Sequence, residues 1–313
     1  MNRTATSQFL GVAVACLLVA QVAAALPASA YSFSRSLQQG DTGRDVKALE
    51  VRVAGWYPSQ NQTTMTVDGR FTAHTAIALK AFQSFYGLTA DGVAGTDTYA
   101  VMSNMLDPDG STVNFAWAEF KQNSSPSCSA KANAYAGTFD GGMGSPDRVK
   151  RHVRRLMWRL EALRAKGGGH IIGINSGFRS IDYNSCIGGA GGSQHMYGTA
   201  ADQRMANVTN HSERVLGEAS DFSGIGCYSQ LTHNHFDIRL ENSDLPSSQF
   251  WWWPKENGRG QDLDDENKPC WGEGATASLP APPGSRSMPE VMTRAQVMAF
   301  AAAGETVNLG TGD

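Results

Sequence analysis

The chain has 313 residues, of which 41% are hydrophobic and 18% are charged. This apolar content is enough for packed cores, so the composition excludes an intrinsically disordered protein. The formal net charge of −3 excludes a large basic footprint for nucleic acid. At about 100–200 residues per domain, the length predicts roughly two domains.

Residues 1–30 have the pattern of a secretory signal peptide. Arg3 provides a positive start, residues 9–20 are apolar, and residues 28–30 (Ala-Ser-Ala) form a small-x-small cleavage site. The apolar run is shorter than the ~20 residues that a membrane span needs, which favours cleavage over a permanent anchor. We therefore expect a secreted protein, outside the cell or in the cell wall, without a membrane partner after cleavage.

Four cysteines follow the predicted cleavage site: Cys128, Cys186, Cys227 and Cys270. An even number in an exported protein predicts two disulfide bonds. Among three connectivities we favour Cys128–Cys186 with Cys227–Cys270, although the sequence alone does not choose between them. No C-x₂₋₄-C pair is present, which argues against zinc bound by these cysteines.

Residues 36–106 have the pattern of a compact unit of three short helices. Apolar residues recur at helical spacing in two stretches. Thr72 stands at the N-cap of the second helix and Gly87 ends it, and a third helix is expected over residues 96–105. Residues 107–114 combine proline, glycine and polar residues, which predicts a linker.

Residues 115–274 are expected to form a second domain of mixed helix and strand. Ser145 and Pro146 predict the start of a long helix that ends at the three glycines of residues 167–169. A run of basic residues predicts that its other face is solvated, with contact to anionic wall polymers as the alternative. These residues are Lys150, Arg151, Arg154, Arg155, Arg159, Arg164 and Lys166. A buried strand is expected next, over residues 170–175.

The first stretch with chemistry is a predicted strand in which His233, His235 and Asp237 alternate. Side chains at alternate positions share one face of a strand. Two imidazoles on one strand face suit a divalent metal ion. Of the five other histidines, four are expected to be structural: His74, His152, His170 and His211.

The second stretch contains His195 and Asp202, which are seven residues apart. They would lie about 10.5 Å apart along a helix and on opposite faces of a strand, so a bend at Gly198 is needed to bring them together. With one histidine of the strand they provide three protein ligands and one open position, as in a catalytic zinc site. We expect one Zn²⁺ per chain, acting on a hydrolysable bond.

Together these stretches resemble the zinc D-alanyl-D-alanine carboxypeptidases of the M15 peptidase family, which share their metal site with lysostaphin-type endopeptidases and the hedgehog domain. The resemblance covers residues 115–239, with S-G-F-R-S at 176–180, S-x-H-x-x-G-x-A-x-D at 193–202 and H-x-H-x-D-x-R at 233–239. It implies an α+β fold in which helices accompany a small antiparallel sheet. It also implies a set of zinc ligands: His195, Asp202 and His235.

The same resemblance implies roles for the neighbouring residues. His233 would be the catalytic histidine, and Arg179 would bind the terminal carboxylate of the substrate, with a structural salt bridge as the alternative. Ser193 would orient the peptide, and Asp237 would fix the tautomer of a histidine. Several relatives place a glutamate base three residues before the last histidine ligand, whereas this chain has Thr232 there.

Residues 36–106 resemble the peptidoglycan-binding module of bacterial wall hydrolases. The matching positions include two Asp-Gly turns and the apolar residues of the expected helices: Leu37, Val46, Leu49, Asp68, Gly69, Phe71, Phe82, Gly87, Asp91, Gly92 and Thr98. A longer polar insertion over residues 60–64 departs from the pattern. The resemblance implies peptidoglycan as a partner, because the residues themselves show no ligand group.

We therefore expect a secreted, monomeric zinc carboxypeptidase that removes the terminal D-alanine of wall stem peptides. A peptidoglycan endopeptidase with the same chemistry is one alternative, and a non-catalytic wall-binding protein with a structural zinc is the other. The tryptophans at 251–253 favour packing over a sugar platform. Residues 275–313 form a Pro/Ala-rich tail, in which residues 289–303 predict a short helix.

Overall fold

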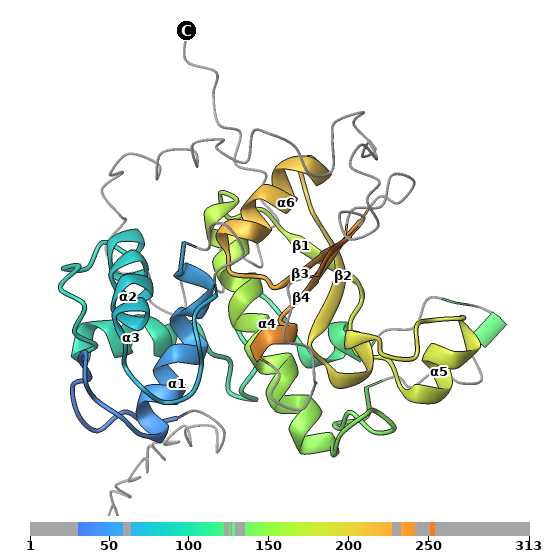
Figure 1. The fold of residues 1–313 in the computed structure, drawn as a ribbon, viewed down its shortest axis with the longest axis horizontal. Helices are drawn as coiled ribbons and strands as arrows, with labels where there is room; N and C mark the ends of the chain where they lie inside the picture. Colours follow the sequence, from blue (N-terminus) through green and yellow to red (C-terminus); the bar gives the residue numbers. More distant parts are fainter. Residues whose placement is uncertain are drawn as a thin grey trace, which may run out of the picture.

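A computed structural model describes residues 31–58, 64–121, 125, 127–128, 135–226, 233–241 and 251–253. The expected signal peptide, Cys227, Cys270 and the tail lie outside these ranges. The described chain forms a helical part and a part with a sheet, which pack side by side (Figure 1). No helix within these ranges combines the length and apolar character needed to cross a bilayer.

The N-terminal part is built from short helices: α1 (Arg44–Val53), the 3₁₀ turn η1 (Ala54–Trp56), α2 (Ala73–Phe85) and α3 (Thr96–Asn104). As the sequence predicted, Thr72 caps α2, because its side chain accepts a hydrogen bond from the backbone of Thr75. The apolar faces of these helices meet in one core around Leu49 and Phe82.

Among the described residues, the second part contains the longest helix and all the named strands. Its helical elements are η2 (Trp117–Lys121), α4 (Pro146–Lys166), α5 (Ile181–Cys186), η4 (Gln194–Tyr197), α6 (Asn210–Ala219) and η5 (Arg239–Glu241). Its strands are β1 (Ile172–Ser176), β2 (Ala200–Met205), β3 (Gly224–Gly226), β4 (Asn234–Asp237) and β5 (Trp251–Trp253). Within the described residues, this arrangement confirms the predicted α+β class.

The sheet has the order β1-β2-β4-β3-β5, and its neighbours are antiparallel except β3 and β5, which are parallel. On β2 and β4, Ala201 pairs with Phe236, and the next pair is Asp202 with His235. Ala201 and Phe236 belong to the core beneath α4 and α6. Because successive side chains alternate in a strand, Asp202 and His235 point to the opposite face.

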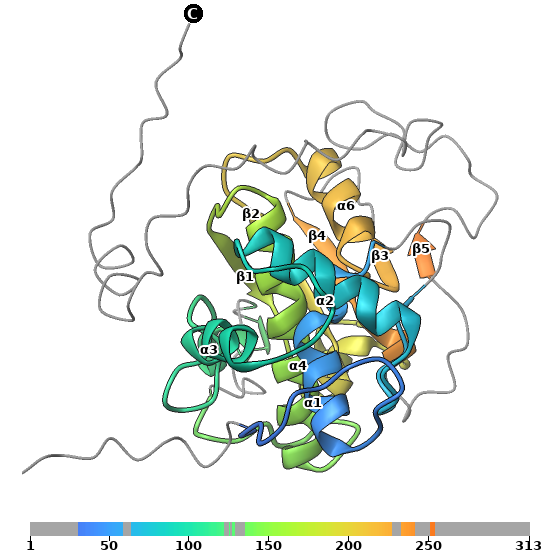
Figure 2. The same ribbon diagram turned by 90° about the vertical axis from the view of Figure 1, so that its left-hand side faces the viewer.

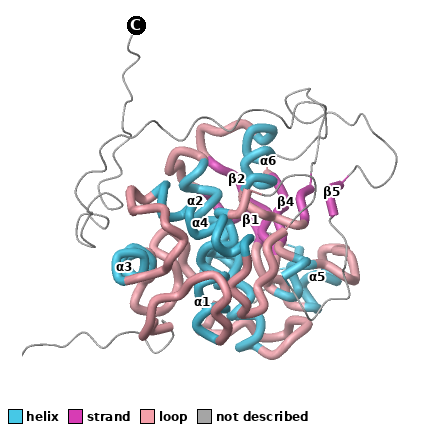
Figure 3. The backbone as a smooth tube through the Cα atoms, turned by 60° about the vertical axis from the view of Figure 1, so that its left-hand side comes forward, coloured by secondary structure: helices cyan, strands magenta, loops and turns pink. Residues whose placement is uncertain are grey.

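Helix α4 lies between the sheet and the N-terminal helices (Figures 2 and 3). Trp158 and Ala162 of α4 belong to the core of the N-terminal part, and a Cβ on Gly55 would lie only 2.6 Å from Cβ of Ala162. The predicted solvated face of α4 is therefore wrong at Arg159, which is 1% exposed. The sequence pattern missed this because α4 is covered on two sides.

One disulfide bond lies within the described residues. Cys186, at the end of α5, is bonded to Cys128, which precedes α4. This confirms one of the two favoured pairs, whereas Cys227 and Cys270 lie outside the described ranges.

Candidate metal centre

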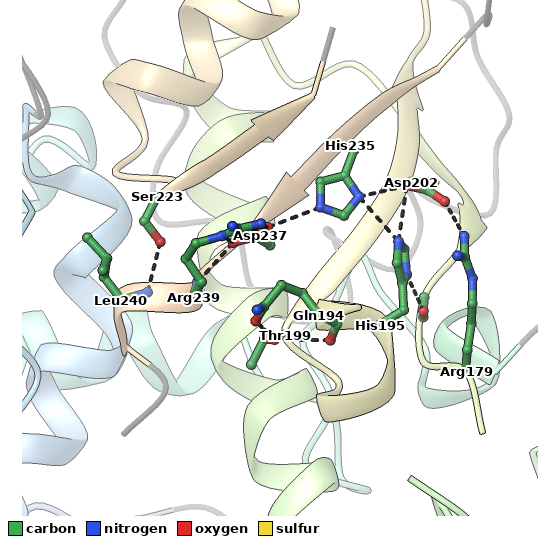
Figure 4. A network of polar contacts seen from close by, with 11 residues as sticks. Arg179, Gln194, His195, Thr199, Asp202, Ser223, His235, Asp237, Arg239 and Leu240 are labelled. Atoms are coloured by element: carbon green, nitrogen blue, oxygen red, sulfur yellow. Dashed lines mark hydrogen bonds and ion pairs between the residues drawn. The ribbon is translucent and has the colours of Figure 1, made fainter. Parts of the chain in front are cut away.

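Three predicted ligands from three elements converge on one point (Figure 4). His195 comes from η4, Asp202 from β2 and His235 from β4. Gly198 adopts the left-handed conformation between η4 and β2, with φ of 73°, which is the bend the spacing requires. All three side chains are buried, and one ligand atom of each lies within 4.8 Å of the others.

Hydrogen bonds decide which nitrogen of each imidazole faces the centre. Nδ1 of His195 donates to the carbonyl of Gly177 at 2.6 Å, so Nε2 faces inward. Nε2 of His235 donates to Asp237 at 3.1 Å, so Nδ1 faces inward. The inward nitrogens lie 3.2 Å and 2.9 Å from Oδ1 of Asp202, respectively. Two imidazole nitrogens and one carboxylate oxygen thus face one another.

Two arginines hold the carboxylates of the site. Nη2 of Arg179 donates to Oδ2 of Asp202 at 2.5 Å, while its Nε donates to the hydroxyl of Ser176. Arg239 donates to both oxygens of Asp237, at distances from 2.6 to 3.2 Å. Each carboxylate therefore has one cationic partner and at least one imidazole partner.

Neighbouring charged groups shift the pKa values of the buried site residues in the direction opposite to the effect of burial. Burial alone would raise the pKa of Asp202, but His195 and His235 outweigh it and hold the pKa well below its usual value. Burial disfavours the charged form of His235, yet the carboxylates of Asp202 and Asp237 raise its pKa to about 9. The two imidazoles beside Asp202 therefore favour the ionised form of this carboxylate.

This donor set fits zinc. Three ligands of N and O type, with one position left open, are the arrangement of catalytic zinc sites. Each histidine ligand has a hydrogen-bonded partner on its other nitrogen, which is the usual outer shell of a zinc histidine. Cys128 and Cys186 are bonded to each other, so neither is available as a zinc ligand, and the three N and O ligands form the centre without sulfur.

The remaining predicted site residues lie around these ligands. His233 is half-buried and stands two residues before His235. Burial lowers the pKa of His233, against the opposing effect of Asp202. Ser193 is half-buried at the N-cap of η4. Thr232 lies outside the described residues.

Some contacts of the site were not predicted from the sequence. The carbonyl of Gly177 has no side-chain signature, and the pairing of Arg179 with Asp202 was not foreseen. Arg239 lies two residues after Asp237, and this short spacing is the sequence feature from which their ion pair could be predicted. His152, expected to be structural, is buried, and its ring lies 2.8 Å from the carbonyl of Tyr197.

The fold and the ligand set define a single-metal centre of the kind found in hydrolytic metalloenzymes. Residues 128–237 match the family described as Peptidase M15, and residues 42–102 match the putative peptidoglycan binding domain. The chain is thus similar to Peptidase M15 proteins over residues 128–237 and to peptidoglycan-binding domains over residues 42–102.

Two relatives and one solved structure are similar to parts of this chain. The zinc D-Ala-D-Ala carboxypeptidase of Streptomyces albus G is 38% identical over 55% of this chain and 62% of its own length. The N-acetylmuramoyl-L-alanine amidase CwlL of Bacillus licheniformis is 32% identical over 26% of this chain and 22% of its length. The crystal structure of the SleB N-terminal domain is 38% identical over 23% of this chain and 93% of that chain, with a TM-score of 0.20.

Proposed function

We propose that this protein is a zinc-dependent peptidase of peptidoglycan that removes the terminal D-alanine from wall stem peptides. The observation that carries the proposal is the convergence of His195, Asp202 and His235 with their ring tautomers fixed. The similarity to a zinc D-Ala-D-Ala carboxypeptidase supports the choice of bond.

The zinc ion and the side chains of the protein would have different roles in the reaction. A zinc ion held by the three ligands supplies Lewis acidity, which activates water and polarises a peptide carbonyl. His233, which directly precedes β4 and lies two residues before His235, would exchange a proton at the reacting atoms. Asp237 would keep Nε2 of His235 protonated so that Nδ1 stays available as the ligand.

Arg179 would bind the terminal carboxylate of the peptide. Its Nε and Nη2 are engaged by Ser176 and Asp202, and within the described residues its Nη1 makes no hydrogen bond. The guanidinium would therefore link the substrate carboxylate to a zinc ligand through one rigid plane. Ser193, at the start of η4, would orient the peptide backbone beside His195.

The peptidoglycan-binding domain would keep the enzyme on its polymeric substrate and raise the effective concentration of stem peptides. We place this domain at residues 36–106, the connection at 107–114 and the peptidase at 115–274. Residues 1–30 would be the signal peptide of a secreted monomer.

The experiment that tests the proposal is D-alanine release from a peptide that ends in D-Ala-D-Ala. The protein is assayed as purified, after treatment with a chelator, and after addition of Zn²⁺. We expect release that is lost with chelator and restored by zinc. The variant His233→Ala should lose release, whereas His74→Ala, an exposed histidine of the other domain, should retain it.

A second substrate separates the carboxypeptidase from its alternatives. A peptide with an amidated C-terminus lacks the carboxylate and should be cleaved poorly. Equal cleavage of both peptides would instead favour an endopeptidase, which cross-linked wall fragments would then test. A folded, zinc-loaded protein without any cleavage would favour a binding protein with a structural zinc.

A further inference from the structure

The ligand His195 is held at two points by the turn that follows β1. Its Nδ1 donates to the carbonyl of Gly177 at 2.6 Å, and its own carbonyl accepts from the backbone N–H of Arg179 at 3.1 Å. A carbonyl can only accept, so the proton must be on Nδ1 and the lone pair on Nε2. The Gly177 carbonyl thereby decides which nitrogen of His195 faces Asp202.

Gly177 is itself pressed against the backbone of η2. A Cβ at Gly177 would lie 2.6 Å from Cα of Phe120 and 2.7 Å from its carbonyl oxygen. The next residue, Phe178, donates its N–H to the same oxygen at 2.5 Å. These are backbone atoms, so no rotation of a side chain makes room. The φ of Gly177 is not in the left-handed region, so the requirement for glycine comes from space alone.

We propose that Gly177 is a positioning residue for the metal centre. Because Gly177 has no side chain, the turn after β1 can pack directly against the backbone of Phe120. This packing fixes the position of the Gly177 carbonyl, which orients the ring of His195. Phe120 provides a firm support, because its side chain is completely buried in the core beneath the sheet. This inference rests on the proposed function in that the centre must bind zinc.

The test compares Gly177→Ala with Gly173→Ala in the full-length protein. Gly173 lies on β1, and a Cβ there would meet no atom within 4 Å, so this variant is the matched control. Zinc affinity is measured by competition with a chromogenic chelator. We expect Gly177→Ala to bind zinc about 10–100-fold more weakly, as outer-shell changes usually do. Gly173→Ala should bind like the unaltered protein.

A spectrum distinguishes positioning from a general loss of stability. The protein loaded with Co²⁺ instead of zinc reports ligand geometry through its visible absorption. Gly177→Ala should change this spectrum, and Gly173→Ala should leave it unchanged. Equal zinc affinity and equal spectra for both variants would overturn the inference. Failure of the unaltered protein to bind zinc would instead overturn the proposed function on which it rests.

Nuclear magnetic resonance of the unaltered protein covers the case in which Gly177→Ala does not fold. Imidazole ¹⁵N shifts report which ring nitrogen carries the proton. We expect His195 to be protonated on Nδ1 before and after zinc is added. A neutral His195 ring with its proton on Nε2 and none on Nδ1 would overturn the inference, whatever the variant does.

Discussion

Arg159 of α4 and Asp221, which follows α6, form an ion pair of 3.0 Å in which both side chains are almost completely buried. Asp221 also accepts a hydrogen bond from the backbone of Met65 at 3.3 Å. The pair therefore joins the N-terminal helical part to the part that contains the sheet. Removal of one member of a buried pair costs more than loss of an exposed pair, because the other charge stays in the interior.

The variant Asp221→Asn should lower the free energy of unfolding by about 3 kcal/mol. Asparagine preserves the shape of the side chain and tolerates the left-handed φ of 60° at this position, so the charge is what changes. Urea unfolding at pH 8 measures the effect. The control is Asp45→Asn, which breaks the more exposed pair with Arg35 and should cost about 1 kcal/mol or less. Equal costs for the two variants would contradict the buried-pair argument.

The two domains should unfold together in a single transition. Trp158 and Ala162 of helix α4, which belongs to the part with the sheet, complete the core of the N-terminal part. In addition, Nζ of Lys166 donates to the carbonyl of Gly55 at 2.8 Å. Domains that share a core lose it at the same time. Differential scanning calorimetry of the full chain should give one peak, and two separated peaks would show that the domains are independent.

Asp237→Asn should weaken zinc binding about 10–100-fold. The variant removes the charge that holds the Nε2 proton of His235, and it leaves Arg239 without its carboxylate. Competition with a chelator measures the affinity. Asp147→Asn changes an exposed carboxylate at the start of α4 and should have no effect. If Asp237→Asn binds zinc as tightly as that control, Asp237 does not act on the ligand.

Arg179→Lys should lower kcat/KM at least about tenfold for a peptide with a free carboxylate. The planar guanidinium of arginine can contact Asp202, Ser176 and a substrate carboxylate at the same time. A lysine has a single ammonium group and cannot make all three contacts. Most of the loss should appear in KM. Arg204→Lys, on the exposed side of β2, is the control and should retain activity. Full activity of Arg179→Lys would assign Arg179 to structure alone.

The sequence pattern indicated His195, Asp202 and one of the two histidines at 233 and 235, and the resemblance to the M15 family selected His235. Alternation along one strand places His235 beside Asp237. The seven-residue spacing from His195 to Asp202 demands a bend, and Gly198 provides it. These relations are local, so the sequence alone carries them.

The contacts that the sequence did not predict come from elements that meet only in the folded chain. Helical periodicity assigned Arg159 to solvent, because a pattern on one helix cannot show that a second domain covers its other side. The acceptor for His195 is a backbone carbonyl, which every residue has, so nothing in the sequence distinguishes Gly177. The sequence left Arg179 with two roles, substrate binding or a structural salt bridge, and it did not indicate that the ion-pair partner is the ligand Asp202.

The stability of the peptidoglycan-binding domain should depend on pH through Glu50 of α1. This side chain is completely buried, and its carboxylate accepts hydrogen bonds from the backbone of Gly69 at 2.7 Å and the hydroxyl of Thr75 at 3.3 Å. Burial outweighs these bonds and raises the pKa of Glu50 to about 7. Between pH 4.5 and 7 the folded state therefore binds more protons than the unfolded state, so the contribution of Glu50 to stability falls as the pH rises.

The variant Glu50→Gln isolates this contribution, because glutamine keeps an acceptor for Gly69 but does not ionise. We measure urea unfolding of both proteins from pH 4 to pH 8. The difference in free energy between variant and unaltered protein should move in favour of the variant as the pH rises, by about 3 kcal/mol at 1.36 kcal/mol per pKa unit. Asp97→Asn, at the exposed start of α3, is the control and should show no such trend. A difference that stays constant over this pH range would mean that Glu50 titrates as it does in the unfolded chain.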